Sequence, residues 1–165
     1  LNCLLGQTIA TCPAQKYKGS MFKVITSISR TDNIIKGKSF YFSEAERLLY
    51  LINTVENDIP SLCIIDELLS GTNSLERFHA AQQILDYLNK NNVLTITATH
   101  DLNLANSLNQ KLDCYYFNDN VDKNGLNFDY TIKKGIAVNG NAIKLLQYLG
   151  YPEEITSKAL NNINI

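Results

Sequence analysis

The sequence predicts an α/β fold in which a parallel sheet forms the core, helices flank it and an antiparallel strand pair closes the chain. Short apolar runs alternate with helical patterns through the middle of the 165 residues, which is typical of parallel strands joined by helices. Two β-rich segments separated by a polar loop follow, and they favour a hairpin. Because we find neither an internal repeat nor a linker, we predict one domain over 1–165.

Five segments have the apolar and β-branched content of strands. The run Leu62–Ile65 is continuous and apolar, which indicates a buried parallel strand. Met21–Ser29 and Val93–Ala98 are the strands predicted before and after it. Leu112–Phe117 and Asn127–Lys133 form the predicted antiparallel pair.

Two longer helices are predicted between these strands. Ser43 and Glu46 have the S-x-x-E spacing of a capping box, so a helix should begin there and end before Pro60. Asn73 can cap a second helix from about Ser74 to Lys90. Its predicted apolar stripe comprises Leu75, Phe78, Ala81, Leu85 and Leu88. The shorter predicted helices are Leu1–Gln7, Asp101–Leu108, Asn141–Leu149 and Pro152–Leu160, the last with proline in its first position.

Composition excludes several classes of protein. The chain has 15 Lys and Arg against 16 Asp and Glu, so its net charge of −1 gives no basic field that would hold nucleic acid non-specifically. No apolar run reaches the roughly 18 residues that a membrane span needs. The four cysteines lie far apart in the sequence, which argues against a zinc site and against a disulfide framework. We therefore expect a reducing, cytoplasmic setting.

The beginning of the chain, Leu1–Leu5, has neither an initiator methionine nor the basic region of a signal peptide. We therefore expect the chain to be a piece of something larger, with its fold truncated at both ends.

The most informative residues are two acids, Asp66 and Glu67, which directly follow the apolar run Leu62–Ile65. A parallel strand delivers its last residues to the carboxyl edge of the sheet, where ligands bind in open α/β folds. Adjacent acids are costly there without a partner, and a magnesium-bound nucleotide would supply one. One acid would then hold the metal ion while the second positions the attacking water. The alternative is that Asp66 caps the following turn and Glu67 is solvated.

Two further features lie beside these acids. His100 follows the next predicted strand and should emerge at the same edge, where an imidazole could hydrogen-bond a terminal phosphate. A structural role for this histidine is the alternative. The loop Ser70–Ser74 joins the acids to the following helix, whose N-terminus is a natural anion site, and Gly71 permits a tight backbone path there. The alternative is a plain loop that Asn73 caps.

The tripeptide Gly37-Lys38-Ser39 has the form of the end of a Walker A motif. A P-loop needs a glycine five residues before its Gly-Lys pair, and Asp32 occupies that position. We therefore reject a P-loop at this place.

Several stretches, taken in order, resemble the ATPase domain of the MutS family, which is an ABC-type P-loop ATPase. Ile64–Ser74 is similar to M-D-E-I-G-R-G-T-S-T, and Ala98–His100 is similar to F-A-T-H. These two matches are the most specific, and the resemblance covers nearly the whole chain. The supporting matches are Pro13–Gln15 with V-P-A-Q, Gly37–Glu44 with G-R-S-T-F-M-V-E, Lys134–Ile136 with D-G-A and Leu149–Ile155 with A-G-V-P-K-E-V-I.

The resemblance implies a P-loop NTPase fold, with ATP and Mg²⁺ as cofactors. Asp66 would be the Walker B acid that holds magnesium, and Glu67 would activate the attacking water. His100 would sense the γ-phosphate. In the family the phosphate loop precedes the helix that would end here near Gly6, and no such loop occurs in these residues. We therefore expect the 165 residues alone to bind ATP poorly and to hydrolyse none detectably.

The resemblance also implies a homodimer formed through the ATPase domain, with DNA bound by domains outside this chain. Ser39 would reach the γ-phosphate bound by the opposite protomer. Thr72 and Asn73 would lie in the loop that crosses the dimer interface, and Gln15 would form the Q-loop.

Several functions remain open at this stage. The first is an ATPase module of a MutS-like mismatch repair protein, which couples hydrolysis to dimer rearrangement on DNA. Because Leu68–Arg77 is closer to MutS-like proteins with a G-T-N-x-x-E-R pattern, a MutS-like ATPase outside mismatch repair is an alternative. A transporter or SMC-like ATPase is less well matched, since Gly37–Glu44 does not fit an L-S-G-G-Q signature. The non-enzymatic alternative is a nucleotide-independent dimerisation module.

Overall fold

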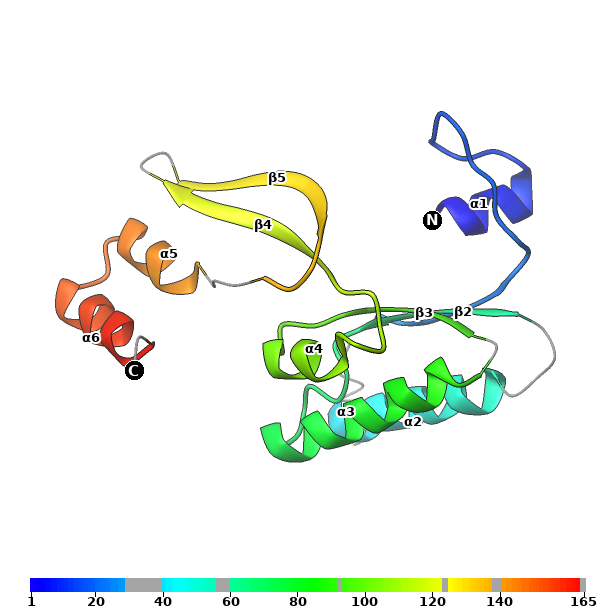
Figure 1. The fold of residues 1–165 in the computed structure, drawn as a ribbon, viewed down its shortest axis with the longest axis horizontal. Coiled ribbons are helices and arrows are strands. Elements are labelled where there is room, and N and C mark those ends of the chain that lie inside the picture. The colour runs from blue at the N-terminus through cyan, green and yellow to red at the C-terminus, as the bar shows by residue number, and fades with distance from the viewer. Residues whose placement is uncertain (29–39, 56–59, 92, 123–124, 138–140, 164–165) are drawn as a thin grey trace. The chain divides into compact units, whose positions relative to one another are not determined.

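The computed structural model describes residues 1–28, 40–55, 60–91, 93–122, 125–137 and 141–163. By their contacts the residues form two compact units, Leu1–Leu104 and Ala105–Ile165, each with its own sheet (Figure 1). The boundary between these units falls within the helix α4 (Leu102–Leu108). That the chain is one domain stays a prediction. In the described ranges no helix combines the length and apolar character that crossing a membrane requires.

The first unit contains a three-stranded parallel sheet, as the sequence predicted. Its strands are β1 (Lys23–Ser27), β2 (Ser61–Asp66) and β3 (Val93–Ala98), in the order β1-β2-β3. Cys63 pairs with Ile25 on one side and with Thr95 on the other, so β2 is the central strand. Most of β2 is buried, which confirms that the continuous apolar run is a buried strand.

Two helices lie on one side of this sheet, α2 (Phe40–Val55) against β1 and α3 (Ser74–Asn89) against β3 (Figure 1). Side chains alternate between the faces of a strand, and the alternate positions Leu94 and Ile96 of β3 are 52% and 55% exposed. The core of this unit therefore forms on the face that the helices cover. Its buried apolar residues include Ile25, Cys63 and Ile65 from the strands, Leu48, Leu51 and Val55 from α2, and Ala81, Leu85 and Leu88 from α3.

The first helix, α1 (Asn2–Ile9), extends two residues beyond the predicted end at Gln7. The Gln7 side chain accepts a hydrogen bond from the Phe22 N–H at 3.2 Å and donates one to the Phe22 carbonyl at 3.0 Å. These two bonds attach α1 to the segment that leads into β1.

The helix α3 begins as predicted, with the Asn73 side chain accepting a hydrogen bond from the Leu75 N–H at 2.9 Å. The prediction that Leu75 belongs to the apolar stripe is wrong, because its side chain is 66% exposed. Leu75 lies six residues before Ala81, which at 3.6 residues per turn is about 120° around the helix. The buried face follows Ala81, Leu85 and Leu88 instead.

The helix α2 begins at Phe40, so the predicted capping box at Ser43 is wrong. Ser43 lies inside the helix and cannot be its N-cap. The buried positions Glu44, Leu48, Leu51 and Val55 recur at the spacing of one helical face. Burial of this face therefore stabilises α2 in its place against the sheet.

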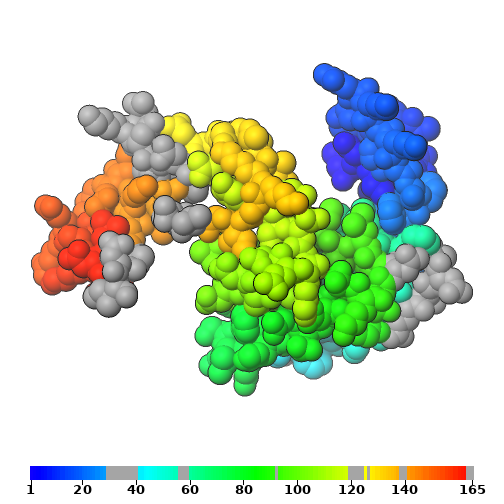
Figure 2. Space-filling model, in the orientation of Figure 1, coloured from blue at the N-terminus to red at the C-terminus, as the bar shows by residue number. Residues whose placement is uncertain are grey.

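The second unit contains an antiparallel hairpin of β4 (Tyr115–Asp122) and β5 (Gly125–Lys134), in agreement with the predicted closing pair. The predicted strand began at Leu112, but the Leu112 N–H donates to the Leu108 carbonyl and so continues the turn after α4. The helices α5 (Ala142–Tyr148) and α6 (Glu153–Ile163) follow and pack together (Figure 2). Pro152 precedes α6 instead of occupying its first position.

We predict that Leu88→Ala lowers the free energy of unfolding by about 2–5 kcal/mol, because Leu88 is fully buried and its truncation leaves a cavity. Leu75→Ala on the same helix is the matched control, and it should change stability by less than about 0.5 kcal/mol. Urea titration of both variants measures the difference. Equal losses would contradict the assignment of the buried face.

A second prediction concerns the thiol of Cys63, which is 0% exposed. Burial raises the pKa of this thiol from 9.0 to about 11, so almost no thiolate is present at pH 8. We expect iodoacetamide to spare Cys63 in the native protein at pH 8 and to modify it after unfolding, as mass spectrometry can show. Because folding favours the protonated thiol, its contribution to stability is present below pH 9 and is lost as the pH rises toward 11.

Candidate functional site

The ends of β2 and β3 lie side by side at the carboxyl edge of the sheet. Asp66 pairs with Ala98, the last residue of β3. The Glu67 N–H then donates to the Ala98 carbonyl at 3.0 Å, which continues the ladder by one bond. The expectation that His100 emerges at the same edge as the two acids is therefore confirmed.

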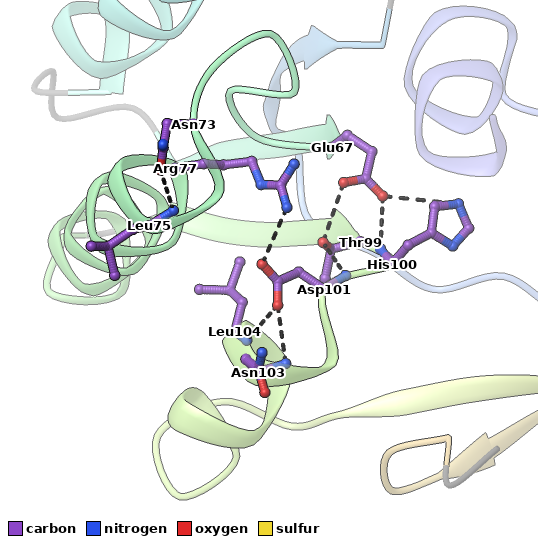
Figure 3. A network of polar contacts seen from close by, with 9 residues as sticks. All are labelled: Glu67, Asn73, Leu75, Arg77, Thr99, His100, Asp101, Asn103 and Leu104. Carbon is purple, nitrogen blue, oxygen red and sulfur yellow. Dashed lines mark hydrogen bonds and ion pairs between the residues drawn. The ribbon is translucent and has the colours of Figure 1, made fainter. Parts of the chain in front are cut away.

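The Glu67 carboxylate is held by the residues that follow β3 (Figure 3). Its Oε1 accepts a hydrogen bond from the His100 N–H at 2.7 Å, and its Oε2 accepts one from the Thr99 hydroxyl at 3.3 Å. The Glu67 side chain is only 16% exposed. The alternative that Glu67 is a solvated surface residue is therefore wrong.

The backbone around Glu67 explains the direction of its side chain. Glu67 has φ 58° and Leu69 has φ 57°, and both values lie in the left-handed region. This conformation costs roughly 1–2 kcal/mol for each residue with a side chain. Leu68 and Leu69 are 2% and 5% exposed, so their burial in the core offsets the strain and anchors the turn.

The imidazole of His100 stands at the edge with 96% of its side chain exposed. Its Nε2 lies 3.9 Å from Glu67 Oε1, and Figure 3 shows the ring pointing away from Asp101. The His100 backbone is fixed by its bond to Glu67, whereas the ring remains accessible to a ligand. A carboxylate and an accessible imidazole at this distance can together exchange protons with a bound molecule.

Asp66 occupies the last position of β2 and is partly exposed. Its carboxylate forms no hydrogen bond to another described residue, so the structure shows no turn capped by it. Among the residues that the structure describes, no group of three or more His, Cys, Asp or Glu could hold a metal ion. Mg²⁺ in nucleotide sites is bound by one or two carboxylates together with phosphate oxygens, and the Asp66 carboxylate fits that donor set.

The loop after the acids contains two of the predicted site residues. The Thr72 hydroxyl donates to Glu76 Oε2 at 3.4 Å, and the Asn73 side chain caps α3. Both residues therefore lie at the N-terminus of α3. Asn73 acts as the N-cap of this helix, as the alternative of a plain loop had it.

Of the two remaining predicted residues, the structure describes only Gln15. Gln15 is exposed in the segment between α1 and β1, where it lines a cavity together with residues of α1 and the same segment. The structure shows no hydrogen bond or ion pair between Gln15 and Asp66 or Glu67. Ser39 lies outside the described residues.

Asp101 is an organising residue that the sequence analysis did not select. Its Oδ1 accepts hydrogen bonds from the N–H groups of Asn103 at 3.0 Å and Leu104 at 3.1 Å, and so caps α4. Its Oδ2 lies 3.7 Å from Arg77 Nη2 on α3. The sequence signals were an aspartate at the first position of a predicted helix and the Glu-Arg pair of the α3 segment, but neither signal predicts the contact.

A family model for MutS domain V matches residues 1–164 of the chain. The chain belongs to the MutS domain V family. The DNA mismatch repair protein MutS of Finegoldia magna is 27% identical to it, over 96% of this chain and 19% of that protein. The chain is also similar to two further DNA mismatch repair proteins MutS. That of Thermus thermophilus is 26% identical over 96% of this chain and 20% of that protein. That of Treponema denticola is 27% identical over 98% of this chain and 18% of that protein. This MutS domain V chain thus spans about a fifth of the length of these relatives.

We predict that Asp101→Ala destabilises the MutS domain V chain by roughly 1–2 kcal/mol, because it removes the N-cap of α4. Arg77→Ala should cost less than about 1 kcal/mol, since the guanidinium is partly exposed and forms one long ion pair. Thermal or urea unfolding measures both changes. Equal effects would mean that the ion pair, and not the cap, carries the stabilisation.

Proposed function

We propose that this chain is the nucleotide-hydrolysing part of a MutS-family DNA mismatch repair protein, in which Mg²⁺-ATP hydrolysis drives the rearrangement of a dimer on DNA. The observation that carries the proposal is the arrangement of Asp66, Glu67 and His100 at one edge of a parallel sheet. Membership of the MutS domain V family supports it, and so do the relatives named as DNA mismatch repair proteins.

Each residue at the edge has a chemical role in this proposal. The Asp66 carboxylate would hold the magnesium ion, which when bound neutralises charge on the phosphate oxygens. The Glu67 carboxylate would orient the attacking water and accept its proton. The exposed imidazole of His100 would hydrogen-bond the terminal phosphate.

The hydrogen bonds of Glu67 are compatible with this role. A carboxylate oxygen has two acceptor sites. Each Glu67 oxygen accepts one described hydrogen bond from the chain, Oε1 from the His100 N–H and Oε2 from the Thr99 hydroxyl. One acceptor site for each oxygen can therefore receive a water, and the two existing bonds hold the carboxylate in a defined orientation.

The other roles in the proposal rest on the family resemblance. Thr72 and Asn73 would lie at the dimer interface beside the N-terminus of α3, Ser39 would reach the phosphate of the opposite protomer, and Gln15 would form the Q-loop. Because the sequence has no Walker A pattern, we propose that the 165 residues by themselves bind ATP weakly and do not hydrolyse it.

A second candidate is a MutS-like ATPase with a role outside mismatch repair. The observation that favours it is the Gly71-Thr72-Asn73 loop followed by Glu76 and Arg77, with Arg77 paired to Asp101. Both candidates share the same hydrolytic chemistry. They differ in the DNA structure that the whole protein would prefer, which binding assays with mismatched, matched and branched duplexes can distinguish.

We predict that Glu67→Gln in the full-length protein lowers ATP turnover by roughly 10²–10⁴-fold, because the amide cannot accept the proton of the attacking water. Binding of ATP should be retained, since Gln keeps the size of the side chain and an oxygen that can accept from the His100 N–H. Phosphate release and equilibrium nucleotide binding measure the two effects.

The matched control for that experiment is Glu154→Gln on α6, whose side chain is 78% exposed, and it should leave turnover unchanged. Unchanged turnover in Glu67→Gln would remove Glu67 from its proposed role. Failure of the wild-type protein to hydrolyse Mg²⁺-ATP would instead favour the nucleotide-independent dimerisation module.

A further inference from the structure

The Thr99 hydroxyl lies between the Glu67 carboxylate and the backbone N–H of Asp101 (Figure 3). It donates to Glu67 Oε2 at 3.3 Å, and it accepts a hydrogen bond from the Asp101 N–H at 3.1 Å. We propose that Thr99 is a positioning residue for Glu67, and that the ion pair between Asp101 and Arg77 fixes the Thr99 hydroxyl for this task. This inference rests on the proposed hydrolytic function of Glu67.

The direction of each hydrogen bond follows from the donors available. A backbone N–H can only donate, so the bond from Asp101 occupies an acceptor site of the Thr99 oxygen. A hydroxyl has one proton, and an ionised carboxylate can only accept. The Thr99 proton therefore points to Glu67 Oε2, across an oxygen–oxygen distance of 3.3 Å.

Two donors are needed to orient a carboxylate. The terminal torsion of a glutamate side chain is soft, so one hydrogen bond to one oxygen leaves the plane of the carboxylate free to turn. The His100 N–H holds Oε1, and the Thr99 hydroxyl holds Oε2. With both bonds in place, the acceptor sites left for a water have defined directions. Orientation of this kind affects the chemical step more than substrate binding.

Asp101 is itself held from two directions. Its Oδ1 accepts from the first N–H groups of α4, and its Oδ2 faces the guanidinium of Arg77 at 3.7 Å. The Asp101 side chain is 16% exposed, so these contacts lie largely out of water. They fix the backbone of Asp101 in the position from which its N–H reaches Thr99. A chain of contacts therefore leads from Arg77 on α3 through Asp101 and Thr99 to Glu67.

The test compares Thr99→Val with Thr99→Ser in the full-length protein. Valine keeps the shape of threonine without the hydroxyl, and serine keeps the hydroxyl without the methyl group. We expect Thr99→Val to lower kcat for Mg²⁺-ATP by roughly 10- to 100-fold, with KM changed by less than about 3-fold. Thr99→Ser should recover kcat to within about 3-fold of the wild type, because it keeps the donor to Glu67.

The matched control is Thr97→Val, two residues earlier in the chain, on β3. The Thr97 hydroxyl is buried and has no hydrogen-bond partner among the described residues, so its removal should leave kcat unchanged. Equal losses in Thr97→Val and Thr99→Val would overturn the proposal, because they would indicate a general effect of valine at or just after the end of β3. A Thr99→Val protein with wild-type kcat would also overturn it.

A second measurement does not depend on turnover. If Thr99 holds the Glu67 carboxylate, Thr99→Val should raise the hydrogen-exchange rate of the His100 amide, whose acceptor is Glu67 Oε1, by about 10-fold or more, whereas Thr99→Ser should not. Unchanged exchange at His100 in Thr99→Val would overturn the positioning of Glu67 by Thr99. If the wild type hydrolyses no ATP but the exchange effect is present, the proposed function fails while the positioning of Glu67 by Thr99 stands.

Arg77 provides a variant on a different element, α3, should Thr99→Val fail to fold. We expect Arg77→Met to lower kcat by roughly 3- to 10-fold and to speed exchange at the Asp101 amide, since the methionine keeps the aliphatic stem but not the charge. Arg77→Lys should recover part of kcat. If Arg77→Met changes neither kcat nor exchange at Asp101, the ion pair has no positioning role and that part of the proposal is overturned.

Discussion

The parallel pairing of β2 with β3 is the constraint on which the candidate site depends. Asp66 lies opposite Ala98, and the Glu67 N–H extends the ladder to the Ala98 carbonyl. Only this register places the backbone of His100 at 2.7 Å from the Glu67 carboxylate. A shift of one residue would turn every side chain of β3 to the opposite face of the sheet. The register is in turn stabilised by the burial of β2 between its two neighbours.

The second requirement is electrostatic. A carboxylate that leaves water must find donors, and Glu67 and Asp101 are each 16% exposed. Both obtain donors from the short segment after β3, which supplies backbone N–H groups to the two acids and the Thr99 hydroxyl to Glu67. This segment therefore organises the edge of the sheet and the start of α4 at the same time. The strained turn at Glu67 directs its carboxylate toward that segment.

The sequence analysis succeeded where local pattern and burial agree. The apolar run of β2, the strand β3 and the Asn73 cap were all predicted, because each depends on a few adjacent residues. It failed at Ser43, where a cap-like spacing was weaker than the burial of the α2 face, and at Leu75, which lies too far around α3 to reach the sheet. The family resemblance, carried mainly by Ile64–Ser74 and Ala98–His100, was confirmed for MutS domain V.

The sequence by itself determined that two acids and a histidine end neighbouring strands, because parallel strands deliver their last residues to one edge whatever the details of packing. Only the tertiary structure decided which donors hold those acids. Arg77 is 24 residues from Asp101, and Glu67 is 32 residues from Thr99, so no local pattern reports their contacts. Their meeting depends on the side-by-side packing of α3 and β3 and on a left-handed turn at Glu67, which a glutamate does not favour on its own.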